Sequence, residues 1–113
     1  TQYTLAVDRN NAVVADYFSP MDPAILSMVH KVAIIGERAG KKVCLCGEAA
    51  SEENLLPVYI GLGVKCFSVR SHMVPCLKSR IQELKNSEVD SLSQKVLQCK
   101  GKEEVKKILD SSR

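Results

Sequence analysis

Tryptophan is absent from this chain of 113 residues, and tyrosine and phenylalanine together supply only five aromatic side chains. Nucleic-acid binding by base stacking needs more aromatics and a denser basic stripe than a net charge of +3 provides. No apolar run approaches the about 18 residues of a membrane-spanning helix. The first residues, 1–11, carry neither an initiator methionine nor a signal-peptide pattern. We therefore expect part of a longer protein that contacts neither nucleic acid nor membrane.

Paired metal-binding motifs are also lacking, although the chain contains five cysteines. No two cysteines have C-x-x-C spacing, and neither histidine lies near a cysteine in the sequence, so we expect no metal site in this chain. The odd number of cysteines and the missing secretory signal favour a reducing cytoplasm over a disulfide scaffold.

Apolar periodicity predicts strands that alternate with helices. Asp22 as N-cap and Pro23 in the first turn open a helix that ends at Gly40. The runs 43–46 and 65–69 are typical of strands buried on both faces of a parallel sheet. The predicted helix carries one apolar stripe, formed by Ile25, Met28, Val29, Val32 and Ile35.

More helices follow in the second half of the chain. One starts near Ser51 or Asn54 and runs to Ile60, and Pro57 fits its first turn best with Asn54 as the cap. The next opens at Pro75 and presents Leu77, Ile81 and Leu84 on one side. Residues 89–98, introduced by the capping pattern Ser87-x-x-Asp90, and residues 103–109 form two short helices. Two strands are too few for a parallel sheet, so the order indicates the last units of a larger α/β protein.

Candidate catalytic groups follow the first strand, because active sites of parallel α/β folds gather past the carboxyl ends of strands. Cys46 is a candidate nucleophile or proton donor, and its alternative role is that of a small, inert core residue. Glu48 could act as an acid–base group or metal ligand, or could cap the next helix and hold a loop amide.

Two further loops contain charged candidates. The guanidinium of Arg9 could bind a phosphate or carboxylate, or could pair with Asp8 or Asp16 at the surface. His72, which follows the second strand, is either a titrating group or an exposed residue without a role. The residues alone therefore predict an active-site face but no particular reaction.

Three segments resemble one known enzyme family. TQYTLAVDRNN (1–11) resembles the segment after the GTND motif of the phosphoenolpyruvate-utilising enzymes, and GKKVCLCGEAA (40–50) resembles their cysteine-bearing strand with its CGE motif. LGVKCFSV (62–69) is similar to the final barrel strand of the family. Within the family, the first segment is nearest to the phosphotransferases of the sugar phosphotransferase system.

The resemblance implies an α/β fold, namely the C-terminal portion of a (β/α)8 TIM-type barrel. Residues 1–113 would be a fragment of the phosphoenolpyruvate-binding barrel domain. About the last two β/α units would occupy residues 1–86, and residues 87–113 would form a helical tail. The resemblance also implies a short helix over residues 1–6, where the alternation of Tyr3, Leu5 and Val7 alone favours a third strand.

The resemblance further implies a reaction. The parent enzyme would transfer the phosphoryl group of phosphoenolpyruvate to its own histidine and on to the histidine-containing phosphocarrier protein, and would release pyruvate. Arg9 matches the arginine that holds the substrate phosphate, and Cys46 matches the cysteine that protonates the enolate carbon. A buried, non-electropositive setting suits such a donor, because its thiol must stay protonated. Gly47, Glu48 and Arg70 are supporting candidates.

Other parts of that enzyme would lie before Thr1. These are the GTND residues, the ligands of a magnesium ion and the phosphorylated histidine, so we expect the isolated chain to be inactive. The resemblance also implies a cytoplasmic homodimer formed through the C-terminal domain. After the last strand the family usually has small residues, whereas this chain has Arg70, Ser71 and His72, which leaves the role of Arg70 open.

Two alternatives stay open at this point. The chain could be a short, non-catalytic interaction module that oligomerises through its helical tail, because unfinished sheets expose edges and apolar helix faces. It could also be the C-terminal part of a pyruvate phosphate dikinase or a phosphoenolpyruvate synthase, which would keep the enzyme class but change the phosphoryl acceptor.

Overall fold

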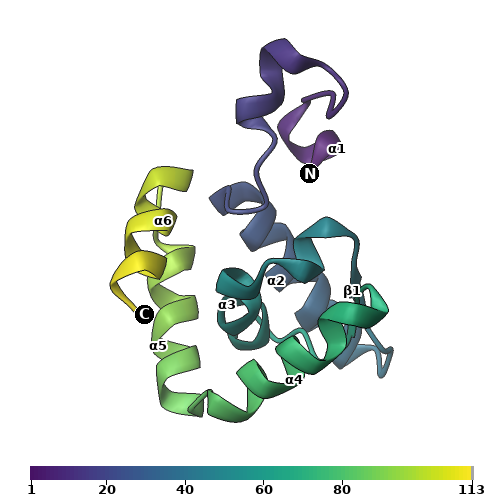
Figure 1. Cartoon of the computed structure of the whole chain (residues 1–113), viewed down its shortest axis with the longest axis vertical. Coiled ribbons are helices and arrows are strands. Elements are labelled where there is room, and N and C mark those ends of the chain that lie inside the picture. The colour runs from purple at the N-terminus through teal and green to yellow at the C-terminus, as the bar shows by residue number, and fades with distance from the viewer. Residues whose placement is uncertain (113) are drawn as a thin grey trace.

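A short central helix is surrounded by longer helices, and a two-stranded sheet lies at one flank (Figure 1). The computed structural model describes residues 1–112, with the side chain of Glu48 outside the description. In chain order the elements are α1 (Gln2–Leu5), η1 (Ala12–Tyr17), α2 (Pro23–Arg38), β1 (Leu45–Cys46), η2 (Glu48–Ser51), η3 (Glu53–Leu55), α3 (Leu56–Gly61), β2 (Phe67–Ser68), η4 (Ser71–Met73), α4 (Val74–Glu83), α5 (Asn86–Leu97) and α6 (Lys102–Ser111), where η denotes a 3-10 helix.

The helix predicted between Asp22 and Gly40 is confirmed as α2. The Asp22 carboxylate accepts a hydrogen bond from the Ala24 amide at 2.9 Å, and Pro23 occupies the first turn. Beyond the end of the helix, Gly40 has a φ of 63°, the left-handed conformation that glycine adopts without steric cost. These signals act within a few residues, which is why the sequence predicts them correctly.

The predicted apolar stripe of α2 is wrong in part. Ile25 is buried, but Met28 and Ile35 are 47% and 64% exposed. The helix buries Leu26 and Ala33 instead, along the flank that packs against α3 and α5. Two adjacent rows of apolar side chains run along this helix, one with Leu26 and Ala33 and one with Met28 and Ile35. The row that contains the small Ala33 packs against the neighbouring helices, because a small side chain allows close approach.

The two strands are parallel neighbours, and each is shorter than predicted. β1 and β2 pair with Leu45 beside Phe67 and Cys46 beside Ser68. Burial on both faces is contradicted: Leu45 and Phe67 pack against the core, whereas Cys46 and Ser68 are exposed on the other face. Nothing in the described part of the chain tests whether the sheet belongs to a barrel, so the barrel stays a prediction.

Helix α3 confirms the place of Pro57 but not the predicted cap. The chain enters α3 through the 3-10 turn η3, and Asn54 lies inside that turn instead of capping the helix. Past the end of α3, Gly63 has a φ of 98°, which redirects the chain toward β2. The helix is almost fully buried, because α2, α4 and α5 pack around it.

The remaining helices lie near their predicted positions, with different ends. α5 begins at Asn86, and Lys85 at its N-cap position makes no capping hydrogen bond through its side chain. The predicted capping pattern at Ser87 is therefore wrong. On α4, Leu77 is buried while Ile81 is exposed, so the predicted apolar side is only partly buried. At the other end of the chain, residues Gln2–Leu5 form a helix, as the family resemblance implies, and the strand suggested by alternation is wrong.

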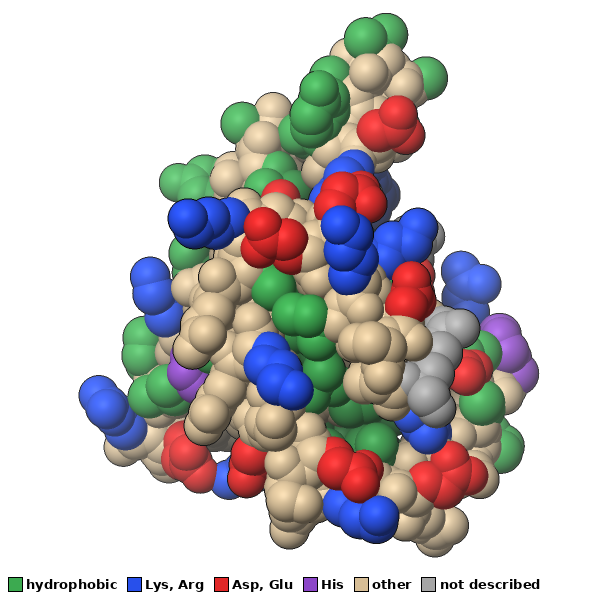
Figure 2. Space-filling view, turned by 90° about the vertical axis from the view of Figure 1, so that its left-hand side faces the viewer, with side chains coloured by type: hydrophobic (Ala, Val, Ile, Leu, Met, Phe, Trp, Pro, Cys, Tyr) green, Lys and Arg blue, Asp and Glu red, His purple; other side chains and the backbone are tan. Residues whose placement is uncertain are grey.

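One hydrophobic core joins the middle of the chain to its C-terminal helices. Its buried members come from α2, α3, α5, α6 and the segments around α3: Leu26, Ala33, Leu55, Val58, Tyr59, Leu62, Val64, Val96, Val105 and Leu109. The N-terminal segment lies apart from this core, and Figure 2 shows apolar side chains on the surface of that upper extension, with charges of both signs interspersed below it.

Among the described residues, no helix is both long and apolar enough to cross a membrane.

Tyr59 contributes the largest of the fully buried side chains, and its hydroxyl has no hydrogen-bond partner among the described atoms. A phenolate in such a place would carry its charge without hydrating water, so ionisation is disfavoured. Burial, assisted by the nearby Glu52 carboxylate, therefore raises the pKa of Tyr59 well above its usual range.

We expect Tyr59→Phe to leave the stability at neutral pH unchanged or to raise it by up to about 1 kcal/mol, because it removes an unpaired buried hydroxyl. The folded-state pKa is raised, so wild-type stability falls as the pH rises above the unfolded tyrosine pKa of about 10, and the variant lacks that fall. Urea unfolding near neutral pH and above pH about 10 measures both effects. Tyr17→Phe, at an exposed position, is the control. If Tyr59→Phe were less stable than wild type at neutral pH, the Tyr59 hydroxyl would have to form a stabilising hydrogen bond, which would contradict the description of it as unpaired.

Candidate active site

The carboxyl ends of both strands meet at one place, because the strands are parallel and in register. Cys46 ends β1, Ser68 ends β2, and the two residues are register partners. Gly47 follows with a φ of 84° and a ψ of −165°, a conformation that only glycine adopts readily. This glycine turns the chain sharply from the strand into the η2 turn, so the backbone beside Cys46 folds back over the strand ends.

A cavity of about 700 Å³ opens at these strand ends. Predicted residues Gly47, Arg70 and His72 line it, so the structure gathers three candidates from two loops. Val69, at the predicted end of the second strand, also lines the cavity, whereas Ser51, Glu52, Ser68 and Met73 were not singled out from the sequence. Ser51 and Glu52 arrive through the 3-10 turns after Gly47, and the only sequence signal for this return was the glycine itself.

Cys46 lies at the end of its strand as predicted, but its surroundings differ from the expected buried setting. The side chain is exposed, on the sheet face opposite to the core-facing Leu45. It is not among the residues that line the cavity, although the next residue, Gly47, is. The thiol therefore lies beside the cavity and open to solvent in this chain.

Arg9 occupies a tight polar turn separate from the strand-end cavity. The Asp8 carboxylate accepts the Asn10 amide at 2.9 Å, and the Asp8 carbonyl accepts the Asn11 amide at 3.1 Å. Among the described side chains, neither Asp8 nor Asp16 forms an ion pair with Arg9. The turn is fixed by its own aspartate, and the structure does not bring Arg9 into the cavity that contains Arg70.

Glu48 and possible metal-binding groups are the remaining candidates near the strand ends. The side chain of Glu48, a supporting candidate, lies outside the described residues. Within the described part of the chain, no three histidine, cysteine or carboxylate side chains gather in a way that would hold a metal ion. No residue of the described part of the chain is therefore assigned to a magnesium ion.

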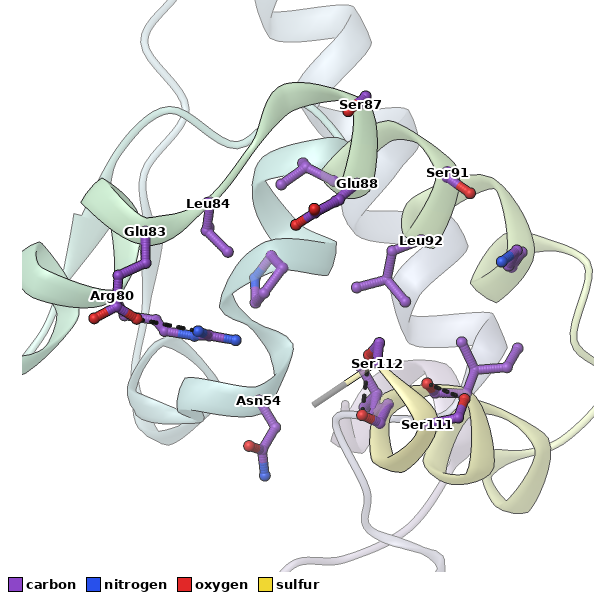
Figure 3. A pocket seen from close by; sticks show the side chains of 15 residues that line it. Asn54, Arg80, Glu83, Leu84, Ser87, Glu88, Ser91, Leu92, Ser111 and Ser112 are labelled. Carbon is purple, nitrogen blue, oxygen red and sulfur yellow. Dashed lines mark hydrogen bonds and ion pairs between the residues drawn. The ribbon is translucent and has the colours of Figure 1, made fainter.

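A second cavity, of about 790 Å³, lies between α3, the α4–α5 connection and α6 (Figure 3). Leu84 and Leu92 point toward it, Arg80 donates to the Glu83 carboxylate at 3.2 Å, and the Ser111 hydroxyl donates to a carbonyl of its own helix at 2.9 Å. None of the candidates predicted from the sequence lines this cavity. We therefore assign the candidate site to the strand ends, where ligand sites of α/β sheets occur.

Comparison with known families identifies the class of protein. Residues 1–86 match the family described as "PEP-utilising enzyme, PEP-binding domain". The match includes the Arg9 turn, both strands and every residue that lines the strand-end cavity. The chain belongs to this family of phosphoenolpyruvate-utilising enzymes.

Particular relatives extend the similarity into the helical tail. The chain is 33% identical over 109 residues to multiphosphoryl transfer protein 1 of Escherichia coli (strain K12). It is 37% identical over 97 residues to the phosphoenolpyruvate-protein phosphotransferase of Buchnera aphidicola subsp. Baizongia pistaciae (strain Bp), and 36% identical over 104 residues to that of Bacillus subtilis (strain 168). These alignments cover 96%, 86% and 92% of this chain but only 13%, 17% and 18% of the relatives. The chain thus spans less than a fifth of their length.

Proposed function

We propose that the chain is the C-terminal part of a phosphoenolpyruvate-protein phosphotransferase. The full enzyme transfers the phosphoryl group of phosphoenolpyruvate to its own histidine and on to the histidine-containing phosphocarrier protein of the sugar phosphotransferase system, and releases pyruvate. The family match over residues 1–86 is the observation that carries this proposal. The names of the relatives favour this branch over a dikinase or a synthase.

The proposed fold of the full domain is a (β/α)8 barrel, of which this chain supplies about the last two β/α units and the tail. The parallel pairing of β1 with β2 supports the proposal, as does the uncovered face of the sheet. In a closed barrel that face would line the interior, and the preceding strands would supply the missing side chains. Residues 1–86 would belong to the barrel units and residues 87–113 to the tail.

The proposed chemistry divides between two residues of this chain. Phosphoryl transfer leaves an enolate, whose charge must be neutralised by cations until an acid delivers a proton to carbon. Arg9 binds the substrate phosphate, because its planar guanidinium matches phosphate oxygens in pairs. Cys46 donates the proton that converts the enolate into pyruvate, and Gly47, Glu48 and Arg70 support the site.

A magnesium ion would complete the site of the full enzyme. When bound, such an ion would supply positive charge that stabilises the transferring phosphoryl group. Its ligands are proposed to lie in the segment before this chain, and no residue of this chain is assigned to it. Further proposals for the full enzyme are a cytoplasmic location, a homodimer formed through the C-terminal domain, and no contact with nucleic acid or membrane.

The isolated 113-residue chain is expected to form no pyruvate from phosphoenolpyruvate and Mg²⁺, because the acceptor histidine and the metal ligands lie elsewhere in the proposed enzyme. The longer polypeptide, with its phosphocarrier protein present, is expected to form pyruvate. Coupling to lactate dehydrogenase and following NADH absorbance measures both. Turnover by the purified chain alone would contradict the proposal that it is an incomplete part of the enzyme.

Arg9→Lys in the longer polypeptide is expected to raise KM for phosphoenolpyruvate by about tenfold or more, since a single ammonium cannot replace two charge-assisted hydrogen bonds. Steady-state kinetics measures the change, and Arg38→Lys in the exposed last turn of α2 is the matched control. Equal kinetics for Arg9→Lys and wild type would remove Arg9 from the phosphate site and leave the family assignment intact.

A further inference from the structure

One face of the two-stranded sheet carries three of the cysteines. The register places Leu45 beside Phe67, so Cys44 and Cys66 adjoin each other one position earlier. Side chains alternate along a strand, so Cys44, Cys46 and Cys66 lie on the face opposite to the two core-facing side chains. The Leu45 amide donates to the Cys66 carbonyl at 2.9 Å, which holds the two strands together at this point.

The thiols of Cys44 and Cys66 are in contact. The Cys66 thiol donates to Cys44 Sγ at 3.1 Å, only about 1 Å more than the length of a disulfide bond. Neighbouring strands lie about 4.8 Å apart, and disulfides bridge Cα atoms about 4.4–6.8 Å apart. A bond between these sulfur atoms therefore needs side-chain rotation but no movement of the strands.

Cys76 and Cys99 form hydrogen bonds with oxygen atoms and not with another thiol. Cys76 donates to the Glu53 carboxylate at 3.0 Å, and Cys99 donates to the Lys95 carbonyl at 3.4 Å. Only Cys44 and Cys66, among the described side chains, form a thiol–thiol hydrogen bond. In this chain Cys44 is exposed and Cys66 is half-buried, so a small oxidant reaches the pair. In the closed barrel proposed above the same two side chains would face the interior, so the inference applies to this chain by itself.

We propose that Cys44 and Cys66 are a modification site, a cross-strand dithiol that hydroperoxides oxidise reversibly to a disulfide. This inference rests on the sheet geometry and does not depend on the proposed enzymatic function. In a reducing compartment the dithiol is the resting form, and the disulfide forms only while oxidant is present. The hydrogen bond with Cys66 and partial burial also raise the pKa of Cys44, which favours the resting thiol.

The oxidation balances with hydrogen peroxide as the oxidant. One sulfur attacks a peroxide oxygen, the O–O bond breaks, and a sulfenic acid and a water molecule form. The second sulfur then attacks the first, the S–O bond breaks, and a second water leaves as the S–S bond forms. The dithiol gives up two hydrogen atoms, the peroxide is reduced to water, and a thiol reductant reverses the change by exchange.

The test is to treat the 113-residue chain with hydrogen peroxide, alkylate the remaining thiols with iodoacetamide, and map the tryptic peptides by mass spectrometry. Trypsin separates the partners, because Lys42, Lys65 and Arg70 leave Cys44 in peptide 43–65 and Cys66 in peptide 66–70. We expect two of the five thiols to be lost, a linked peptide pair whose fragmentation assigns the bond to Cys44, and recovery with dithiothreitol. The rate of linkage should not change with protein concentration, because the reaction is intramolecular.

Variants and a folding measurement complete the experiment. Cys44→Ser and Cys66→Ser should each abolish the link, whereas Cys99→Ser should leave it unchanged, and circular dichroism reports whether each chain is folded. A link from Cys66 to Cys46 instead, or linkage that rises with protein concentration, would overturn the proposal. So would the absence of any link in a folded wild-type chain, a result that needs no variant.

Discussion

Cys46→Ser in the longer polypeptide is expected to lower kcat for pyruvate release by about 10²–10⁴-fold, the usual contribution of a positioned proton donor. A serine hydroxyl is a far weaker acid than a thiol, so it cannot deliver the proton on the same timescale. KM for phosphoenolpyruvate should change little, because the thiol acts on the enolate and not on the bound substrate. Steady-state assays of pyruvate release give kcat and KM. Phosphorylation of the acceptor histidine is measured separately.

Cys44→Ser is the matched control for that substitution. Cys44 lies two residues earlier and is likewise exposed, so the same change of side chain is made two register positions from the strand end. We expect this variant to keep most of the activity. Equal losses for the two variants would contradict the role of Cys46 as proton donor and would indicate a general disturbance of the strand.

Gly61→Ala is expected to destabilise the fold by about 2–3 kcal/mol, although alanine is the better helix former. A Cβ at this position would lie 2.6 Å from the Val89 carbonyl oxygen and 2.7 Å from Ser93 Cβ, so α3 and α5 would have to separate. Backbone cannot rotate out of such a clash as a flexible side chain can. Urea unfolding followed by circular dichroism measures the loss of stability.

Gly101→Ala separates this clash from the general effect of adding a methyl group. Nothing lies within 4 Å of a Cβ built at Gly101, whose φ of −156° is open to any residue. We expect a change within about 0.5 kcal/mol. If Gly61→Ala were as stable as Gly101→Ala, the close packing of α3 on α5 would be refuted.

Local sequence signals predicted those parts of the fold that are decided locally. Asp22, Pro23 and Gly40 define α2 through a side-chain cap, a preset φ and a left-handed glycine. The caps predicted at Asn54 and Ser87 failed, because a cap contributes only about 1 kcal/mol and burial of an apolar side chain contributes more. The start of α5 therefore follows the packing of its buried residues against α3.

The burial of individual side chains was harder to predict than the elements. Met28 and Ile35 have the same apolar character as Leu26, and periodicity alone does not tell which row of α2 meets a partner. The small residues Ala33 and Gly36 mark the row that does, because a Cβ at Gly36 would lie 2.2 Å from Val43 Cγ2. Small residues among large apolar ones would have been the better guide.

The candidate site was predicted in position but not in composition. The strand-end rule indicated Gly47, Arg70 and His72, and the structure brings these three residues to one cavity, which leaves their roles a prediction. It gave no warning of Ser51 and Glu52, because these arrive through 3-10 turns that have no strong sequence pattern. The role proposed for Arg9 depends on the family resemblance, since the chain itself does not bring that residue to the cavity.

The position of α3 has a consequence for the order of events during synthesis. The core around it is completed by Val96, Val105 and Leu109, which follow α3 in the sequence and are therefore synthesised after it. Until those residues leave the exit tunnel of the ribosome, the hydrophobic core around α3 and the two short strands is incomplete. We therefore expect a chain stalled before residue 96 to be sensitive to protease and to bind chaperones.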